Sequence, residues 1–225
     1  MTGTGDSDAV SIRGLLRTLP VFGRPLPGFD PDAVPDEPVS LFASWLGQAV
    51  DAKVVEPHVM TLSTVDAQGR PDARVVILRD VSDEGWQFTA SAAGAKGAQL
   101  ASNPQAALSF YWREQGRQVR VRGQVAAAEP SVSAAEFLAQ SAGSRIADLV
   151  GRQSTVLRDS AELAHAMEAA RQRLADDPEL VAPDHTVYTL SPAEAVFWQG
   201  DHQRQHIRLR YRRSGRGWVT ERLWP

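Results

Sequence analysis

Short strand-like runs joined by tight turns constrain the fold of this chain more than any other feature. Residues 58–65, 73–80 and 86–91 are rich in β-branched and apolar side chains, and the turn-forming runs DAQGRP and SDEG separate them. Connections this short leave no room for a crossover helix, so neighbouring strands must run antiparallel. The sequence therefore predicts an antiparallel meander.

Four further runs extend the predicted sheet. Residues 106–112 and 117–125 face each other across the turn REQG. Residues 206–213 and 217–223 do the same across the turn SGRG. With the first three runs, these four make seven strand candidates.

Apolar periodicity predicts helices between the strands, with candidate N-caps at Ser40, Ser131 and Ser160. The helices cover residues 40–50, 94–104 and, as two or three segments, 131–176. Most helical residues thus come after the fifth strand. The combination predicts a mainly β fold with inserted helices (α+β), built as an antiparallel barrel or sandwich.

The beginning of the chain has a different composition. Residues 20–38 contain six prolines, each of which removes a backbone donor and fixes φ, so we expect an extended arm. No internal repeat or interior linker interrupts the rest of the chain. The predicted organisation is a proline-rich N-terminal arm over residues 1–38 and one domain over residues 39–225.

Composition excludes several classes of protein. The formal net charge is −3 and the pI is about 6.0, whereas a general nucleic-acid binder needs an excess of Lys and Arg. The chain has no cysteine, so we expect neither a thiolate metal site nor an oxidising compartment. Its first residues lack the pattern of a signal peptide, and no apolar run approaches the ~20 residues of a membrane span. We expect a cytoplasmic protein with no membrane or nucleic-acid partner and no bound metal.

Against this acidic background, the C-terminal part of the chain concentrates cationic groups. At strand period, His206 and Arg208 fall on one face, whereas Leu209 and Tyr211 fall on the other. Trp198 lies just upstream and offers a flat apolar surface. A stacking plane beside cationic donors suits a small anionic ligand, and a solvated strand face is the alternative.

Three other motifs carry groups that suit such a ligand. The glycines of GAKG let backbone N–H groups approach a phosphate at a helix N-terminus, where Lys96 adds a charge. Arg74 and Arg79 stand at the two ends of an apolar strand, and each can touch an anion. Gln118 projects from the polar face of its strand, where its carboxamide suits the edge of a heteroaromatic ring. Each motif also has a purely structural interpretation. GAKG can simply begin a helix, the two arginines can lie at the rim of the sheet, and Gln118 can belong to a half-solvated strand.

Taken in chain order, these motifs resemble the pyridoxamine 5'-phosphate oxidase family. The matching runs are RVVILR (74–79), GAKG (94–97), RQVRVRG (117–123), RQS (152–154), FWQG (197–200), RQH (204–206) and the closing ERLWP. The resemblance extends from about residue 40 to the C-terminus. It implies an FMN-binding split β-barrel that works as a homodimer, with FMN at the subunit interface.

The resemblance also implies, by position, which residues bind FMN. They are Arg74, Val75, Val76, Ile77, Leu78, Arg79, Thr89, Ala90, Lys96, Gln118, Gln153, Ser154, Trp198 and Arg208. The cationic members would hold the flavin phosphate through charge-assisted hydrogen bonds. Ala95 departs from the family, which usually has a second basic residue there.

The implied reaction is an oxidation. A hydride passes to FMN from a small heterocyclic amine or alcohol of the pyridoxamine or pyridoxine 5'-phosphate type. Oxygen then reoxidises the flavin with release of hydrogen peroxide. Arg204 and His206 are the implied catalytic residues, over the substrate face opposite the flavin, and His206 can exchange a proton near neutral pH.

The implied substrate site departs from the family. Where the family clamps the substrate phosphate with a lysine, a tyrosine, an arginine and a serine, this chain has Arg79, Glu136, Gln140 and Ser144. A carboxylate ~4 Å from a like charge costs about 4 kcal/mol at an effective dielectric near 20. Two alternatives therefore stay open. One is oxidation of an unphosphorylated specialised metabolite, as in the phenazine-biosynthesis oxidase branch, which the run YWRE (111–114) also resembles. The other is a flavin-binding module without turnover.

Overall fold

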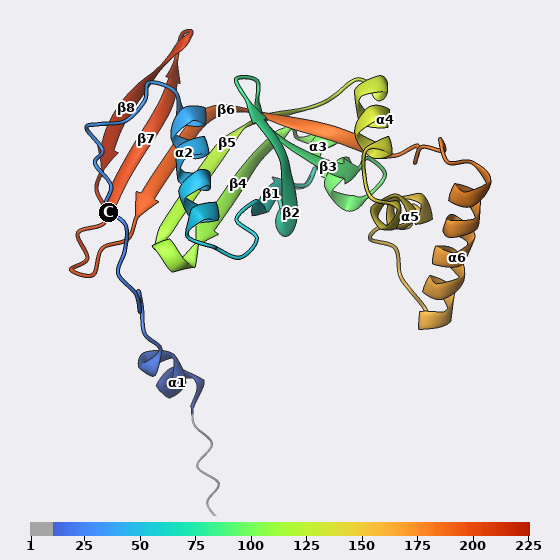
Figure 1. Ribbon diagram of the computed structural model, residues 1–225, viewed down its shortest axis with the longest axis horizontal. Helices are drawn as coiled ribbons and strands as arrows, with labels where there is room; N and C mark the ends of the chain where they lie inside the picture. Colours follow the sequence, from blue (N-terminus) through green and yellow to red (C-terminus); the bar gives the residue numbers. More distant parts are fainter. Residues whose placement is uncertain (1–10) are drawn as a thin grey trace, which may run out of the picture.

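Eight antiparallel strands form one sheet in the computed structural model, which describes residues 11–225. The strand order is β3-β2-β1-β4-β5-β6-β7-β8, and a further pairing of β3 with β6 closes the first six of these into a barrel (Figure 1). The strands are β1 Val59–Val65, β2 Pro71–Ser82, β3 Gly85–Ser91, β4 Gln105–Trp112, β5 Arg117–Ala127, β6 His185–Gln199, β7 Ile207–Ser214 and β8 Gly217–Leu223. The predicted antiparallel split barrel is confirmed. Residues 1–10, where the predicted arm begins, lie outside the described residues.

Helices precede the first strand, connect β3 to β4 and fill the long insertion before β6. They are α1 Ile12–Thr18, α2 Pro38–Asp51, α3 Ala95–Ser102, α4 Pro130–Leu138, α5 Ala142–Val150, α6 Ser160–Asp176 and a 3-10 turn Arg113–Gln115. Helices α4, α5 and α6 confirm the predicted late insertion. The sequence does not predict α1, which lies within the predicted arm. Within residues 11–225, no helix is long and apolar enough to cross a membrane.

Three predicted N-caps are wrong: Ser40, Ser131 and Ser160. Helices α2 and α4 begin earlier, at Pro38 and Pro130, because the fixed φ of proline suits the first helical position. Helix α6 begins at Ser160, but the preceding residue is its cap. The carboxylate of Asp159 accepts a hydrogen bond from the backbone N–H of Glu162 at 2.8 Å.

The barrel core is aromatic, and α2 packs into it. Side chains of β1 alternate strictly between buried and half-buried positions, as the two-residue period of a strand requires. The ring of Phe42 on α2 lies 4.8 Å from that of Phe110, and the ring of Trp45 lies 5.3 Å from that of Phe197. These contacts fix α2 against β4 and β6.

One charged residue shares this core. The sequence places Arg117 on the apolar face of its strand, and the residue is only 1% exposed. Its guanidinium donates to the side-chain oxygens of Gln199 and Gln48, each at 2.8 Å, and lies 4.2 Å from the ring centre of Trp45. Burial lowers the pKa of Arg117 to about 10. A further hydrogen bond to the Gly28 carbonyl, at 3.2 Å, ties the arm to the barrel.

The longest strand, β6, is absent from the seven predicted strands. Its 15 residues pair with β3, β5 and β7, so β6 is the strand that closes the barrel. A proline inside a run argues against a strand, but Pro192 lies at a bulge, where the pairing with β5 shifts between Arg122 and Gly123. A Cβ on Gly123 would lie 2.0 Å from the backbone oxygen of Ser191, so this close approach requires glycine.

The three helices of the insertion form a small core of their own beyond one end of the barrel (Figure 1). Phe137 of α4, Leu149 of α5 and Leu174 of α6 are buried together there. The helices thus form a unit that β6 joins to the barrel.

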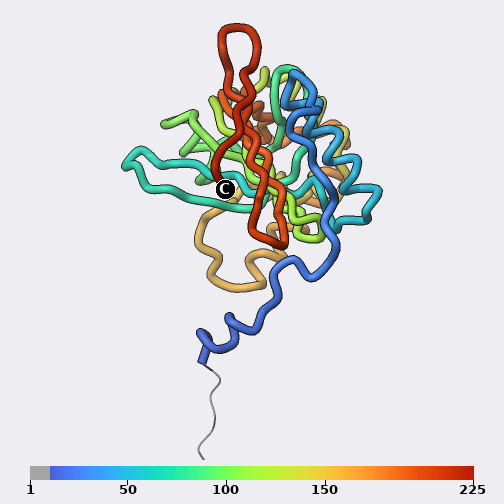
Figure 2. Tube along the Cα trace, turned by 90° about the vertical axis from the view of Figure 1, so that its left-hand side faces the viewer, coloured from blue at the N-terminus to red at the C-terminus, as the bar shows by residue number. Residues whose placement is uncertain are grey.

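The second half of the arm is anchored to the barrel. The Tyr211 hydroxyl donates to the Pro35 carbonyl at 2.8 Å, and the ring of Phe29 lies 4.9 Å from that of Trp45. Arg222 of β8 forms an ion pair with Asp32. Figure 2 shows the arm running along the side of the barrel from α1 to α2, while α1 stands clear of the sheet. Residues 19–37 form neither helix nor strand, but several bends and a turn at residues 31–32 interrupt the predicted extended conformation.

Candidate functional site

A cationic cluster forms where β2, α3 and the loop after α5 meet. Lys96 Nζ donates to Gln153 Oε1 at 2.6 Å. The Arg74 guanidinium donates to the hydroxyl of Thr64 at 2.5 Å and to Oε1 of Gln99 at 2.9 Å. Burial lowers the pKa of Lys96, and the nearby charge of Arg74 lowers it further. An anion bound beside these two cations would stabilise both.

The beginning of α3 adds backbone donors to this cluster. Its N-cap, Gly94, has no side chain to cap the first N–H groups of the helix, so they stay available to a ligand. A Cβ on Gly94 would lie 2.9 Å from Oε1 of Gln153, so glycine also lets the loop approach. Lys96, the helical N–H groups and Arg74, which also pairs with Asp72 at 2.5 Å, fit the phosphate of FMN.

A second group lies on the outer face of β4 to β7. Tyr111, Gln118, Trp198 and Arg208 are direct partners on successive strands, so their side chains leave the same face in one row. They line a hollow of about 300 Å³. An indole plane beside a carboxamide and a guanidinium fits a heteroaromatic ring with polar edges.

These two groups are separate within one chain. Arg74 is on β2 and Gln118 is on β5, three strand spacings away, or about 15 Å across the sheet. The strand register pairs Arg74 with Leu62, Leu62 with Leu108 and Leu108 with Val121. Gln118 lies three residues beyond Val121, which adds about 10 Å along the strands. The predicted flavin contacts therefore divide into two groups.

The two predicted catalytic residues lie in the loop before β7. His206 Nδ1 accepts a hydrogen bond from the backbone N–H of Asp201 at 3.0 Å, so the neutral ring carries its proton on Nε2. The ring lies 5.0 Å from that of Trp198. Arg204 is exposed, and its φ of 66° holds it in the turn that Asp201 begins. One short loop thus carries both groups next to the outer row.

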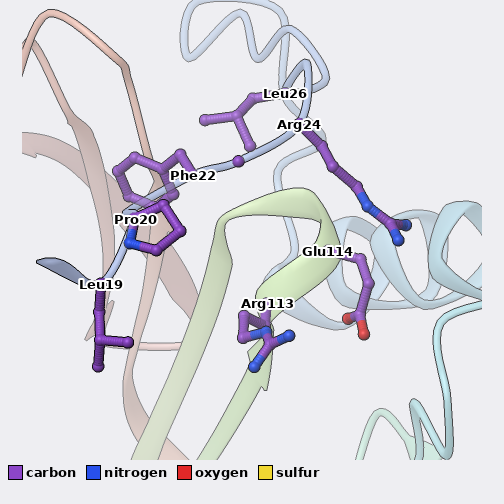
Figure 3. A pocket seen from close by; sticks show the side chains of 8 residues that line it. Leu19, Pro20, Phe22, Arg24, Leu26, Arg113 and Glu114 are labelled. Atoms are coloured by element: carbon purple, nitrogen blue, oxygen red, sulfur yellow. The ribbon is translucent and has the colours of Figure 1, made fainter.

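The arm reaches this loop through Phe22. Its ring centre lies 6.0 Å from those of Trp198 and His206. Gly200 leaves room for it, because a Cβ there would lie 2.7 Å from the ring. Six residues of the arm between Leu19 and Leu26, with Arg113 and Glu114 of the 3-10 turn, line an adjoining cavity of about 470 Å³ (Figure 3). Sequence reasoning missed Phe22, because a lone aromatic residue among prolines shows no periodicity.

Three of the four residues at the implied substrate clamp come together. Arg79 Nε lies 3.6 Å from Glu136 Oε1, and Gln140 Nε2 donates to Glu136 Oε2 at 2.9 Å. Ser144 differs, because its backbone N–H and its hydroxyl both contact the hydroxyl of Ser141, which caps α5. The carboxylate at position 136 therefore faces the cation that the resemblance assigns to the substrate.

Sequence reasoning missed two residues beside this clamp, His185 and Asp148. His185 begins β6, and its side chain is 2% exposed. Its Nε2 lies 2.6 Å from Glu136 Oε2, and its Nδ1 lies 2.8 Å from Asp148 Oδ2. Because the sequence does not predict β6, it gives no reason to bring His185 to helices α4 and α5.

The remaining predicted cofactor positions divide by burial. Val76, Leu78 and Ala90 point into the barrel core, so a ligand can reach only their backbone. Those with accessible side chains are Val75, Ile77, Thr89 and Ser154. The exposed pair on β2, Val75 and Ile77, lies on the outer face of the sheet.

Comparison with known proteins decides the family. The family model described as "Pyridoxamine 5'-phosphate oxidase" matches residues 46–199, and the "Pyridoxine 5'-phosphate oxidase C-terminal dimerisation region" matches residues 185–225. The chain belongs to the pyridoxamine 5'-phosphate oxidase family. Its cofactor is therefore FMN, the protein is an FMN-dependent oxidoreductase, and it contains the dimerisation region of the family.

Individual relatives match this oxidase over most of its length. A pyridoxine/pyridoxamine 5'-phosphate oxidase of Hyphomonas neptunium is 42% identical, over 84% of this chain and 88% of its own. One of Ectopseudomonas mendocina is 38% identical, over 88% and 93%. The crystal structure of PhzG from Burkholderia lata 383, in complex with tetrahydrophenazine-1-carboxylic acid, is 30% identical with a TM-score of 0.81, and it covers 89% of this chain and 99% of PhzG.

Proposed function

We propose that two copies of this chain hold FMN between them and oxidise a small heterocyclic amine or alcohol. The observation that carries this proposal is the division of the flavin residues into two groups, about 15 Å apart across the sheet and about 10 Å along it. The cluster at α3 fits a phosphate, and the outer row fits a ring. Both groups contact one flavin if each copy supplies one of them.

The residues then have distinct tasks. Arg74 and Lys96 neutralise the flavin phosphate, and the backbone N–H groups of α3 complete its hydrogen bonds. Gln118 and Trp198 orient the ring system. When bound, FMN accepts a hydride and passes the electrons to oxygen. His206 holds a proton on Nε2 in the adjoining loop, where it can hydrogen-bond a substrate heteroatom.

Two substrate classes have specific support. The names of relatives 38–42% identical to this chain favour pyridoxine and pyridoxamine 5'-phosphates. The similarity to PhzG, together with the contact of Glu136 with Arg79, favours an unphosphorylated ring. A non-catalytic flavin carrier is less well supported, because Arg204 and His206 are retained.

Titration of the cofactor-free protein with FMN tests the cofactor site. We expect flavin fluorescence to be quenched on binding, and we expect Lys96→Met to weaken the affinity about tenfold or more, since a charge-assisted contact to phosphate is lost. Lys53→Met is the matched control, because Lys53 is the only other lysine of the chain and lies at the end of α2. Equal affinities for the two variants would contradict the assignment of Lys96.

Turnover is tested separately with the FMN-loaded protein under air. Pyridoxamine 5'-phosphate, pyridoxamine and a reduced phenazine carboxylic acid are supplied in turn, and hydrogen peroxide is measured. We expect peroxide from at least one of them. Flavin that stays oxidised with all three in anaerobic mixing would instead indicate a carrier without turnover.

A further inference from the structure

A buried imidazole ring lies between two carboxylates beside the implied substrate clamp. His185 contacts Glu136 of α4 through Nε2 at 2.6 Å and Asp148 of α5 through Nδ1 at 2.8 Å. A carboxylate can only accept hydrogen bonds, so both ring nitrogens must donate, and His185 is held as an imidazolium. Burial alone lowers the pKa of His185, but the hydrogen bonds and charges of Asp148 and Glu136 outweigh it and raise the pKa.

The imidazolium in turn fixes Glu136 in its charged form. Its Oε2 accepts from both His185 and Gln140, at 2.6 and 2.9 Å. Its Oε1 faces Arg79, 3.6 Å from Nε. The side chain of Glu136 is 25% exposed and that of Arg79 is 35% exposed, so a ligand can reach both. A ligand that approaches Arg79 therefore also approaches a carboxylate that cannot turn away without losing its partners.

The charges of the four groups in direct contact already balance. Arg79 and the imidazolium of His185 carry two positive charges, and Glu136 and Asp148 carry two negative ones. A bound phosphate dianion needs a net positive surrounding, which this group does not offer. The guanidinium of Arg79 still has N–H groups beyond Nε that can donate to a hydroxyl or carbonyl oxygen.

We propose that Glu136, positioned by His185 and Asp148, makes this oxidase select substrates that carry no phosphate at the end facing Arg79. The inference rests on the proposed function and names the substrate class of that site. A phosphate placed against Arg79 meets the charge of Glu136, and we expect a loss of affinity on the order of a hundredfold after partial screening by solvent.

The catalytic test compares pyridoxamine 5'-phosphate with pyridoxamine on the FMN-loaded enzyme. We expect the ratio of their kcat/KM values to be near or below one for the natural chain. In Glu136→Gln we expect the ratio to rise about tenfold or more, mainly through a lower KM for the phosphorylated substrate. Glu129→Gln is the matched control, since Glu129 directly precedes α4 and makes no side-chain cap hydrogen bond. A hundredfold preference of the natural chain for the phosphate, or an unchanged ratio in Glu136→Gln, would overturn the proposal.

His185→Asn tests the positioning role. This change leaves Glu136 charged without the offsetting imidazolium, so the ratio should fall below that of the natural chain. A purely structural role would instead lower kcat/KM equally for both substrates, and that result would remove His185 from the proposal.

A binding measurement decides the question without turnover. 4-Deoxypyridoxine and its 5'-phosphate lack the oxidisable group, and calorimetry with the FMN-loaded protein gives their affinities. We expect the phosphate to bind no more tightly than the free alcohol, and about tenfold more tightly in Glu136→Gln. Tight, selective binding of the phosphate by an active, FMN-loaded enzyme would contradict this inference alone. Failure of the protein to bind FMN would contradict the proposed function.

Discussion

A single imidazole ring joins three elements of this protein. His185 belongs to β6, and its two nitrogens contact carboxylates on α4 and α5, while the ring of Phe137 lies 5.2 Å away. His185 is thus one of the polar links between the helical unit and the barrel. Removing the ring would leave Glu136 and Asp148 without their shared partner, at a cost of about 1–3 kcal/mol.

The stability of this junction should depend on pH. The folded protein holds the proton of His185 more tightly than the unfolded chain, because the pKa is raised in the fold. This contribution is therefore fully present below the unfolded pKa of about 6.5, and it is lost as the pH rises through the folded pKa. We expect the natural chain to be more stable than His185→Gln to urea at pH 6, and the difference to shrink as the pH is raised to 9.

His165→Gln supplies the control for that experiment. His165 lies on the exposed side of α6, so its removal should leave the pH dependence of unfolding unchanged. A difference that stays constant across the range would mean that the pKa of His185 is the same in the folded and the unfolded chain, which would contradict the prediction.

At the scale of elements, the pairing of β5 with β6 depends on the bulge at Gly123. A Cβ there would lie 2.0 Å from a backbone oxygen of β6, and backbone cannot move aside as a flexible side chain can. We expect Gly123→Ala to lower the free energy of unfolding by about 3 kcal/mol, measured by urea denaturation. Gly47→Ala is the matched control. Nothing lies within 4 Å of a Cβ at that position of α2, so alanine should stabilise the helix by about 0.5–1 kcal/mol.

The same bulge explains which strands could be predicted from the sequence and which could not. The strands with short turns are predicted directly by alternation and turn residues, as in the hairpin of β7 and β8. Strand β6 escapes this prediction because Pro192 interrupts it, and the bulge opposite Gly123 makes the proline tolerable. Residues 185–190 (HTVYTL) do favour a strand locally, but only the pairing with β3, β5 and β7 shows that both halves form one strand.

At the scale of the whole molecule, we propose that a second copy packs against the exposed apolar residues of β2. Val75 is 67% exposed and Ile77 is 43% exposed on the outer face. We expect the natural chain to be a homodimer by light scattering, and Val75→Asp with Ile77→Asp to shift it to monomer and weaken FMN binding. Val55→Asp is the control, since Val55 is 76% exposed and lies in the loop between α2 and β1. A dimer that survives the double change would place the interface elsewhere.

Part of the candidate site could be predicted from the sequence. Lys96 with Gln153, and Gln118 with Trp198, lie in short runs that resemble the family, and the structure brings each pair together. Phe22, Asp148 and His185 stand in no such run, and only the folded chain brings them to the site. The cytoplasmic location expected from the cysteine-free composition stays a prediction.

Strand β6 carries His185 at its first position and Trp198 near its last, about 45 Å apart along one extended backbone. The proposed selectivity at one end and the proposed flavin stacking at the other thus belong to the same strand. Exchanges with related enzymes should therefore transplant β6 whole, so that both ends keep their spacing.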